Sequence, residues 1–306
     1  MYRFSLIIIH RNGYDRLKNT LESALKIIGP QDEIIVVDNF SNDKSILKIR
    51  KNKDFRIIKI IENSWNKGFG SAANIGMRST MAKFFLICNN DIVLEKNTLE
   101  AFEKDFESYP NTGLISGQLK DLDGNCSRTC SNLPSFWSEF DGIAKITNYT
   151  QPKKISKVGV VRGACIAVNS RVVDEVGMYD EDFFFYSEDT EWSIRMNKKG
   201  YDVMFDPEIF TSHIGGSTTS EVYINSRVEF YKSRMILWDK IFSKPQVLIL
   251  KLWNYPKLLL DMIFYFLAYL LSLGKIKKYW NKFLDRSVVI LWFVLFKPKF
   301  LEIPRK

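Results

Sequence analysis

Short apolar segments alternate with amphipathic ones along the first ninety residues. Four runs are rich in isoleucine and valine, and stretches with helical spacing of apolar positions lie between them. The runs are Phe4–Ile9, Glu33–Val37, Arg56–Ile61 and Lys83–Cys88, and the helical stretches are Leu17–Ile27, Lys44–Lys51 and Ser71–Met81. This alternation is typical of βαβ units, so it predicts an α/β fold with a mostly parallel sheet flanked by helices.

Polar residues follow the predicted strands at one edge of the sheet. Right-handed crossovers bring residues 10–12, 38–43, 62–68 and 89–91 to that edge, where ligands of open α/β sheets bind. Farther along, a less regular stretch over residues 117–157 predicts loops above this edge. Val158–Asn169 is a further strand candidate, and Thr190–Lys199 has an amphipathic helical pattern.

The last eighty residues have a different composition. Residues 226–306 carry 16 Lys and Arg against 5 Asp and Glu, whereas residues 1–225 carry 28 against 30. Apolar and aromatic runs lie among these basic residues; they are Leu258–Leu260, Met262–Leu273 and Val288–Phe296. We therefore predict an α/β domain over residues 1–225 and a basic helical tail over residues 226–306.

The tail fits an anionic membrane surface, because basic residues alternate with aromatic and aliphatic ones. Nucleic acid would attract the charge without requiring such apolar runs, so it is not an expected partner. The uncharged run Met262–Gly274 has 13 residues, fewer than the roughly 20 of a membrane span. We expect helices in the plane of the cytoplasmic face of the cell membrane. A short or re-entrant insertion, and a helical subdomain or dimer interface, remain as alternatives.

The cysteines and the N-terminus favour a reducing, cytoplasmic setting. Cys88 and Cys165 lie in apolar runs and are predicted to be buried thiols. Cys126 and Cys130 could pair or bind a metal, but no second pair has the spacing of a zinc site. The apolar stretch at the N-terminus is too short for a signal peptide and fits a first strand.

Three polar clusters carry the candidate chemistry. Asn89-Asn90-Asp91 ends the fourth strand, Glu188-Asp189 precedes a helix, and His213 precedes a pair of glycines. Together they offer ligands for a divalent cation and a base, the groups needed to move a substituent off a diphosphate. Asp38 ends the second strand and could accept a hydrogen bond from a nucleoside, or simply cap a turn. His10 is expected either to have a structural role or to line a nucleotide pocket.

A dinucleotide-binding pattern competes with this interpretation. The segment Gly68–Ala73 fits G-x-G-x-x-A and follows a predicted strand. It lies in the third βα unit, however, whereas the fingerprint belongs to the first. It also leaves Glu188-Asp189, His213 and the basic tail unexplained, so nicotinamide chemistry is disfavoured.

Several segments occur in a characteristic order over about residues 3–216. They are Ile34–Ser41, Asn63–Gly70, Ala73–Gly76, Asn89–Asp91, Arg162–Ala164, Tyr186–Trp192 with Arg195, and His213. This set resembles the family-2 inverting glycosyltransferases of GT-A fold, and within them it is most similar to bacterial rhamnosyltransferase-type enzymes of surface polysaccharide assembly. The chain departs from the family at its DXD-type motif, where Asn89 and Asn90 stand at the earlier acidic positions.

The resemblance implies a role for each motif. Asp189 would be the general base, and Asp91 with His213 would bind Mg²⁺ or Mn²⁺ against the donor diphosphate. The implied nucleotide-binding residues are Asp38, Asn66, Gly68, Asn74 and Asn90. The implied acceptor-side residues are Gly163, Ala164, Glu188 and Trp192.

The sequence thus predicts a membrane-associated inverting glycosyltransferase. It would move a sugar from dTDP-rhamnose or a UDP-sugar to a hydroxyl of a lipid-linked glycan or oligosaccharide. A sugar nucleotidyltransferase is one alternative, although His10-Arg11-Asn12-Gly13 is a poor version of the glycine-rich loop that it needs. A catalytically lapsed glycan-binding subunit is another, suggested by Asn89 and Asn90.

Overall fold

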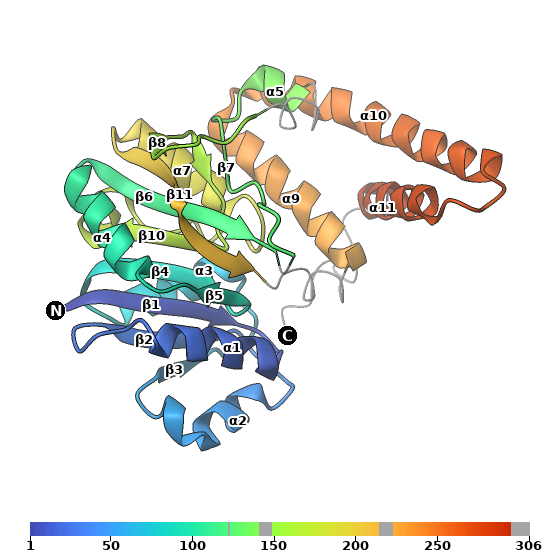
Figure 1. The fold of residues 1–306 in the computed structure, drawn as a ribbon. Helices are drawn as coiled ribbons and strands as arrows, with labels where there is room; N and C mark the ends of the chain where they lie inside the picture. The colour runs from blue at the N-terminus through green and yellow to red at the C-terminus, as the bar shows by residue number, and fades with distance from the viewer. Residues whose placement is uncertain (122, 141–148, 214–222, 295–306) are drawn as a thin grey trace.

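The computed structural model describes residues 1–121, 123–140, 149–213 and 223–294, without the side chains of 213, 223 and 224. Within these residues a nine-stranded sheet forms the centre of the molecule (Figure 1). Its strands, in spatial order, are β3 (Lys59–Glu62), β2 (Glu33–Asp38), β1 (Tyr2–His10), β4 (Ala82–Asn89), β10 (Cys165–Asn169), β6 (Thr112–Lys120), β11 (Asp202–His213) and β5 (Ile92–Leu94), with β8 (Ser156–Lys157) beside β11.

The first four strands are parallel, as predicted. β1 pairs with β2 and β4, and β2 pairs with β3. The helices between them are α1 (Tyr14–Leu25), α2 (Ser45–Lys51) and α3 (Phe69–Arg78). His10 lies opposite Asp38 in the register, and Asp38 lies opposite Glu62. The strand ends therefore share one edge, which confirms that part of the sequence analysis.

The second half of the sheet is mixed. β10 runs antiparallel between β4 and β6, and β5 runs antiparallel to the end of β11. The helices here are α4 (Thr98–Ser108), α6 (Ser170–Val176) and α7 (Glu188–Lys198). The predicted strand Val158–Asn169 is two strands, β9 (Val160–Val161) and β10, and β9 pairs with β7 (Cys130–Ser131). Gly163 lies between β9 and β10, and its N–H donates to the Asp189 carboxylate.

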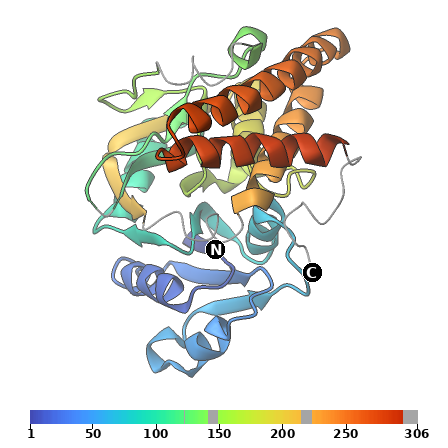
Figure 2. The ribbon, with the colours of Figure 1, turned by 90° about the vertical axis from the view of Figure 1, so that its right-hand side faces the viewer.

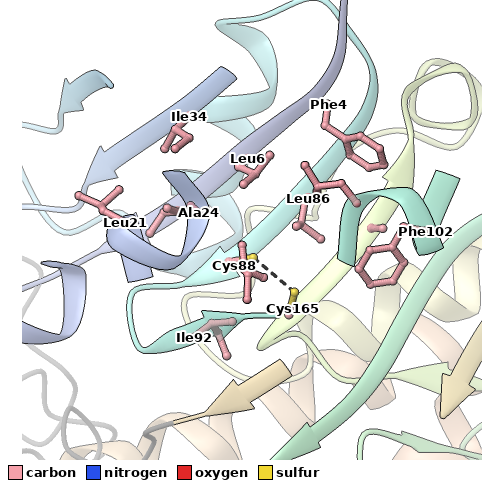
Figure 3. Close-up of a cluster of buried hydrophobic side chains, with 14 of the residues drawn as sticks. Phe4, Leu6, Leu21, Ala24, Ile34, Leu86, Cys88, Ile92, Phe102 and Cys165 are labelled. Atoms are coloured by element: carbon pink, nitrogen blue, oxygen red, sulfur yellow. Dashed lines mark hydrogen bonds between the residues drawn. The ribbon is translucent and has the colours of Figure 1, made fainter. Parts of the chain in front are cut away.

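The core lies on both faces of the sheet, because successive residues of each strand point to opposite sides. Leu6 packs on the face covered by α1 and α4, whereas Ile7 packs on the other face. Figure 3 shows the cluster of buried side chains that contains Leu6, in which the Sγ atoms of Cys88 and Cys165 lie 3.4 Å apart. Both are buried free thiols, as predicted, and the four cysteines of the described chain form no disulfide.

Three helices follow the sheet: α9 (Tyr223–Ile241), α10 (Lys244–Leu271) and α11 (Lys277–Val294). α9 lies beside the α/β body, and α10 with α11 forms a hairpin that extends away from it (Figures 1 and 2). The short helix α5 (Phe136–Phe140) contacts the start of α10. None of the helices in the described part of the chain has both the length and the apolar character that a membrane span requires. The predicted boundary after residue 225 falls in the first turn of α9.

Candidate active site

A chain of hydrogen bonds joins the ends of β1 and β4. Asn90 Nδ2 lies 2.8 Å from His10 Nδ1 and donates to the Asn12 carbonyl at 3.0 Å. His10 Nε2 lies 2.7 Å from Ser45 Oγ. Burial lowers the pKa of His10 to about 4, so the ring is neutral at pH 7 and accepts at Nδ1 from the amide. Asn90, predicted to contact the nucleotide, thus also fixes the loop after β1.

Asp38 caps the turn that follows β2. Its Oδ1 accepts a hydrogen bond from the Ser41 hydroxyl, and its Oδ2 accepts from the Ser41 N–H at 3.2 Å. Burial raises the pKa of this carboxyl. The turn-capping alternative is therefore realised. Each carboxylate oxygen still has a second lone pair, and a nucleotide contact by Asp38 remains a prediction.

The loop between β3 and α3 is organised by Asn39, which the sequence analysis did not single out. Its Nδ2 donates to Asn66 Oδ1 at 2.9 Å and to the Gly68 carbonyl at 3.0 Å, and its Oδ1 accepts from Lys67 N at 2.9 Å. Gly68 has φ +86°, and a Cβ there would come within 2.2 Å of the Phe184 carbonyl oxygen. The glycine is therefore required by contact with the chain before α7, whatever its role toward a nucleotide.

Asn74 lies in the interior and is hydrogen-bonded to the segment before α7. Its Nδ2 donates to the Tyr179 carbonyl and to Glu181 Oε1, both at 2.9 Å, and its Oδ1 accepts from Tyr179 N at 3.0 Å. The side chain is 1% exposed. Because its polar atoms are used within the protein and solvent barely reaches it, we correct its assignment from a nucleotide contact to a support of the segment before α7.

Asp189 is held at the N-terminus of α7 by backbone amides. Its Oδ2 accepts from Gly163 N at 2.9 Å, and its Oδ1 accepts from Thr190 N at 2.6 Å. Burial raises the pKa of the carboxyl, and these hydrogen bonds partly offset that effect. The Ala164 carbonyl accepts from Asn89 N at 3.0 Å. Gly163 and Ala164 thereby bring the predicted base next to the end of β4.

Glu188 adjoins Asp189 and is 7% exposed. Burial, and then the neighbouring Asp189 charge, raise the pKa of Glu188 to about 8. Among the described residues, its Oε2 has no hydrogen-bond partner. The raised pKa places a proton on Glu188 at neutral pH, and the N-terminus of α7 stabilises negative charge on the adjacent Asp189.

Trp192 does not face an acceptor. Its ring is fully buried, its Nε1 donates to the Gly177 carbonyl at 2.8 Å, and its ring centroid lies 4.2 Å from that of Tyr179. The predicted acceptor contact is therefore wrong, because the indole is part of the core. Arg195, whose partner the sequence did not identify, binds Glu191 through two hydrogen bonds of 2.9 and 2.7 Å.

The two predicted metal ligands lie at the adjacent ends of two neighbouring strands. Asp91 is buried at the turn into β5, and His213, the last residue of β11, pairs with Ile92 in the β5–β11 register. The side chain of His213 lies outside the described residues. A carboxylate and an imidazole suit a divalent cation that takes its other ligands from substrate phosphates and water. Among the described side chains, no three His, Cys, Asp or Glu residues form a metal cluster by themselves.

The family model for glycosyl transferase family 2 matches residues 5–177, more than half of the chain. The chain belongs to glycosyl transferase family 2. It is 22% identical over 206 residues to the poly-beta-1,6-N-acetyl-D-glucosamine synthase of Staphylococcus epidermidis, covering 66% of this chain and 48% of the relative. It is also 22% identical over 199 residues to the synthase of Staphylococcus aureus strain MSSA476, covering 64% and 46%. The chain spans about half the length of these relatives.

Solved glycosyltransferases share the fold of this family member. Mannosyltransferase PcManGT from Pyrobaculum calidifontis, solved with GDP-Man and Mn²⁺, superposes with a TM-score of 0.60 at 14% identity, over 95% of this chain and 86% of that chain. Staphylococcus aureus TarS gives 0.55 at 16% identity, over 78% and 39%. GalNAc-T7, solved with UDP, GalNAc and Mn²⁺, gives 0.54 at 16% identity, over 69% and 44%. The predicted GT-A fold and family are confirmed.

Proposed function

We propose that this family-2 member is an inverting transferase that moves a sugar from a nucleotide-diphosphate sugar to an acceptor hydroxyl. The observation that carries the proposal is the Asp189 carboxylate at the start of α7. Two backbone amides orient it, and the neutral acid of Glu188 lies beside it. A carboxylate fixed next to the ligand-binding edge of the sheet is suitably placed to act as a general base.

In this proposal Asp189 accepts the acceptor hydroxyl proton. The acceptor oxygen forms a bond to the anomeric carbon as the bond from that carbon to the diphosphate breaks on the opposite face. One carboxylate is sufficient, because an inverting transfer forms no covalent glycosyl–enzyme intermediate. The amides of Gly163 and Thr190 keep the carboxylate in place while it takes up the proton.

A divalent cation would be held by Asp91 and His213. Mn²⁺ or Mg²⁺ bound there would offset the charge that develops on the leaving diphosphate. Support comes from the positions of Asp91, directly before β5, and His213, which pairs with Ile92 of β5, and from two proteins of the same fold that were solved with Mn²⁺.

The proposed donor is dTDP-rhamnose or a UDP-sugar, and the proposed acceptor is a lipid-linked glycan or oligosaccharide. Sugar nucleotides are favoured because structural neighbours were solved with UDP or GDP-Man. The loops after β1, β2 and β3 lie at one edge of the sheet, beside β4, and would enclose the nucleoside, with Asp38, Asn66, Gly68 and Asn90 at that edge.

We also propose that the α10–α11 hairpin attaches the enzyme to an anionic membrane surface at the cytoplasmic face. Large apolar side chains at helical spacing are exposed along α10; they are Leu252, Leu260, Ile263, Phe264, Leu267, Leu270 and Leu271. Lys275, Lys277 and Lys278 are exposed next to them, at the turn into α11. Basic residues beside an apolar face match the chemistry of an anionic lipid surface.

The positions of the acidic residues in the hairpin also support an outward-facing apolar surface on α10. Arg286 of α11 lies 3.9 Å from the Asp261 carboxylate of α10, and Asp285 of α11 is buried, 3.5 Å from Arg227 of α9. The acidic side chains of the hairpin therefore lie near arginines of neighbouring helices, while large apolar side chains of α10 face outward. A helix of a soluble protein usually presents polar residues on its exposed face.

Substitution of the base tests the proposed reaction. We expect Asp189→Asn to lower sugar transfer by about 10²–10⁴-fold with little change in donor affinity, measured by release of nucleoside diphosphate and by calorimetry. Asp174→Asn, on an exposed position of α6, is the matched control. Retention of most turnover by Asp189→Asn would exclude it as the base. Release of pyrophosphate in place of nucleoside diphosphate by the unaltered enzyme would favour a nucleotidyltransferase.

A further inference from the structure

The turn directly before Glu188-Asp189 has an uncommon backbone conformation. Tyr186 has φ +70° and Ser187 has φ +66°, so two consecutive non-glycine residues lie in the left-handed region. Residues with a Cβ adopt this region only where the surrounding structure fixes them, and such positions cluster at functional sites. The contacts that fix this turn therefore decide where α7, and Asp189 with it, begins.

The first half of α9 holds the turn. Ser233 is fully buried, and its hydroxyl donates to the Phe185 carbonyl at 2.7 Å. The Phe230 ring packs edge-on against the Tyr186 ring, with centroids 5.7 Å apart. The Tyr186 hydroxyl also shares a hydrogen bond with Ser226. Three successive turns of one helix thus contact two residues of the chain before α7.

The second half of α9 holds the preceding residues. Leu237 is buried with Phe183. Lys240 Nζ lies 2.7 Å from the carboxylates of both Asp180 and Asp182. Side chains three or four residues apart share one face of a helix. The face of α9 defined by residues 226, 230, 233, 237 and 240 therefore lies along the segment 180–186.

The opposite side of this segment contacts the predicted nucleotide loop. The Phe184 carbonyl accepts from Phe69 N at 3.0 Å and approaches Gly68. Asn74 of α3 holds Tyr179 and Glu181. The segment that carries the candidate base is thus held between the loop that begins α3 and helix α9.

We propose that α9 is part of the catalytic unit and that Ser233 is a positioning residue, which fixes the Tyr186–Ser187 turn and through it the Asp189 carboxylate. The inference rests on the proposed role of Asp189 as the base. Without the Ser233 hydroxyl, the Phe185 carbonyl loses this partner, and the turn can relax toward ordinary φ values. The start of α7 then shifts relative to Gly163, so the base is misaligned while the donor loops are unchanged.

Ser233→Ala in the full chain tests this. Transfer to a soluble acceptor should show kcat lower by about tenfold, since small misplacements of a catalytic group are costly, with the KM for the sugar nucleotide within about twofold of the unaltered enzyme. Ser79→Ala is the matched control, because Ser79 makes the same type of bond, to the Gly76 carbonyl at 2.8 Å, at the far end of α3. It should leave both constants unchanged.

Unchanged kcat in a folded Ser233→Ala enzyme overturns the inference. If that variant does not fold, Lys240→Gln decides. Its kcat is expected to fall about two- to threefold at constant KM, because α9 then loses its ion pairs with Asp180 and Asp182. An unaltered kcat in Lys240→Gln then overturns the inference. An inactive Asp189→Asn beside a fully active Ser233→Ala refutes the positioning role alone. A fully active Asp189→Asn refutes the proposed base, and the inference with it.

Discussion

Helix α9 and the α10–α11 hairpin follow one another in the same basic region, yet their apolar side chains differ in exposure. Leu237 of α9 is 4% exposed and packs against the segment before α7, whereas Leu271 of α10 is 85% exposed. The polar residues differ as well: buried Ser233 of α9 donates to the Phe185 carbonyl, whereas in the hairpin Asp261 lies near Arg286 and Asp285 lies near Arg227 of α9. Composition therefore groups two units that differ in what they cover: α9 packs against the segment before α7, whereas the outer face of α10 is exposed.

Truncation is expected to give the largest difference between α9 and the hairpin, in sugar transfer and in vesicle binding. A chain ending at residue 257 keeps α9 and the first turns of α10, where Val247 and Leu250 pack with Trp238. We expect it to transfer sugar to a soluble acceptor and to lose vesicle binding. A chain ending at residue 222 lacks α9 and should lose at least about 10²-fold of transfer. Both are measured by nucleoside diphosphate release and vesicle sedimentation.

Equal losses in the two truncated chains would contradict the comparison. That result would mean that α9, α10 and α11 act as one helical subdomain, the alternative left open by the sequence. Vesicle binding by the chain ending at 257 would place the membrane contact outside the hairpin.

The sequence predicted best what neighbouring residues encode. The four parallel strands and their shared edge follow from local apolar runs separated by helical spacing, as His10 opposite Asp38 illustrates. The family and its ordered motifs were also recognisable. The antiparallel direction of β10 was not, because it depends on where the chain re-enters the sheet beside β4.

The errors at the site concern residues whose partners lie far away in sequence. Asn74 bonds to Tyr179, 105 residues on, and no local pattern reveals that contact. Trp192 follows two acidic residues of a recognisable motif, but its side chain points into the core. Ser233 was missed because its partner Phe185 is 48 residues earlier and a lone serine in a helix carries no signal.

Matched leucine substitutions sharpen the comparison at single residues. Leu237→Ala removes a buried side chain of α9 and should lower the free energy of unfolding by about 2–5 kcal/mol, with vesicle binding unchanged. Leu271→Ala should change stability by less than about 0.5 kcal/mol and weaken binding to anionic vesicles several-fold. Chemical denaturation and sedimentation measure the two effects. A loss of stability in Leu271→Ala comparable to that in Leu237→Ala would show that the outer face of α10 is covered.

The buried acid at the contact with α9 makes a pH-dependent difference. The pKa of Glu188 is raised to about 8, from an ordinary 4.5, by burial and by the charges of Asp189 and Glu229; Tyr179 also lies near. The folded state therefore binds a proton that the unfolded state has lost between these values. The free energy of unfolding should fall as pH rises from about 5 to 8.

Glu188→Gln should remove about 3–4 kcal/mol of that decline, measured by denaturation at several pH values. The chain ending at residue 257 should keep the decline, because Glu188 lies near α9 and the deleted residues belong to the hairpin and beyond. A decline of the same size in Glu188→Gln would assign it to another group.

The central claim is that this edge of the sheet binds a nucleotide-diphosphate sugar together with a divalent cation. A thermal-shift measurement on the full chain, with UDP-sugars and dTDP-rhamnose, with and without Mn²⁺ or Mg²⁺, tests it most directly. At a donor concentration of about 100 Kd the folded state gains about 2.7 kcal/mol, so the Tm should rise by about 4 °C. The metal-dependent part of that rise should disappear in Asp91→Ala. No rise with any sugar nucleotide in the presence of either metal would contradict the account.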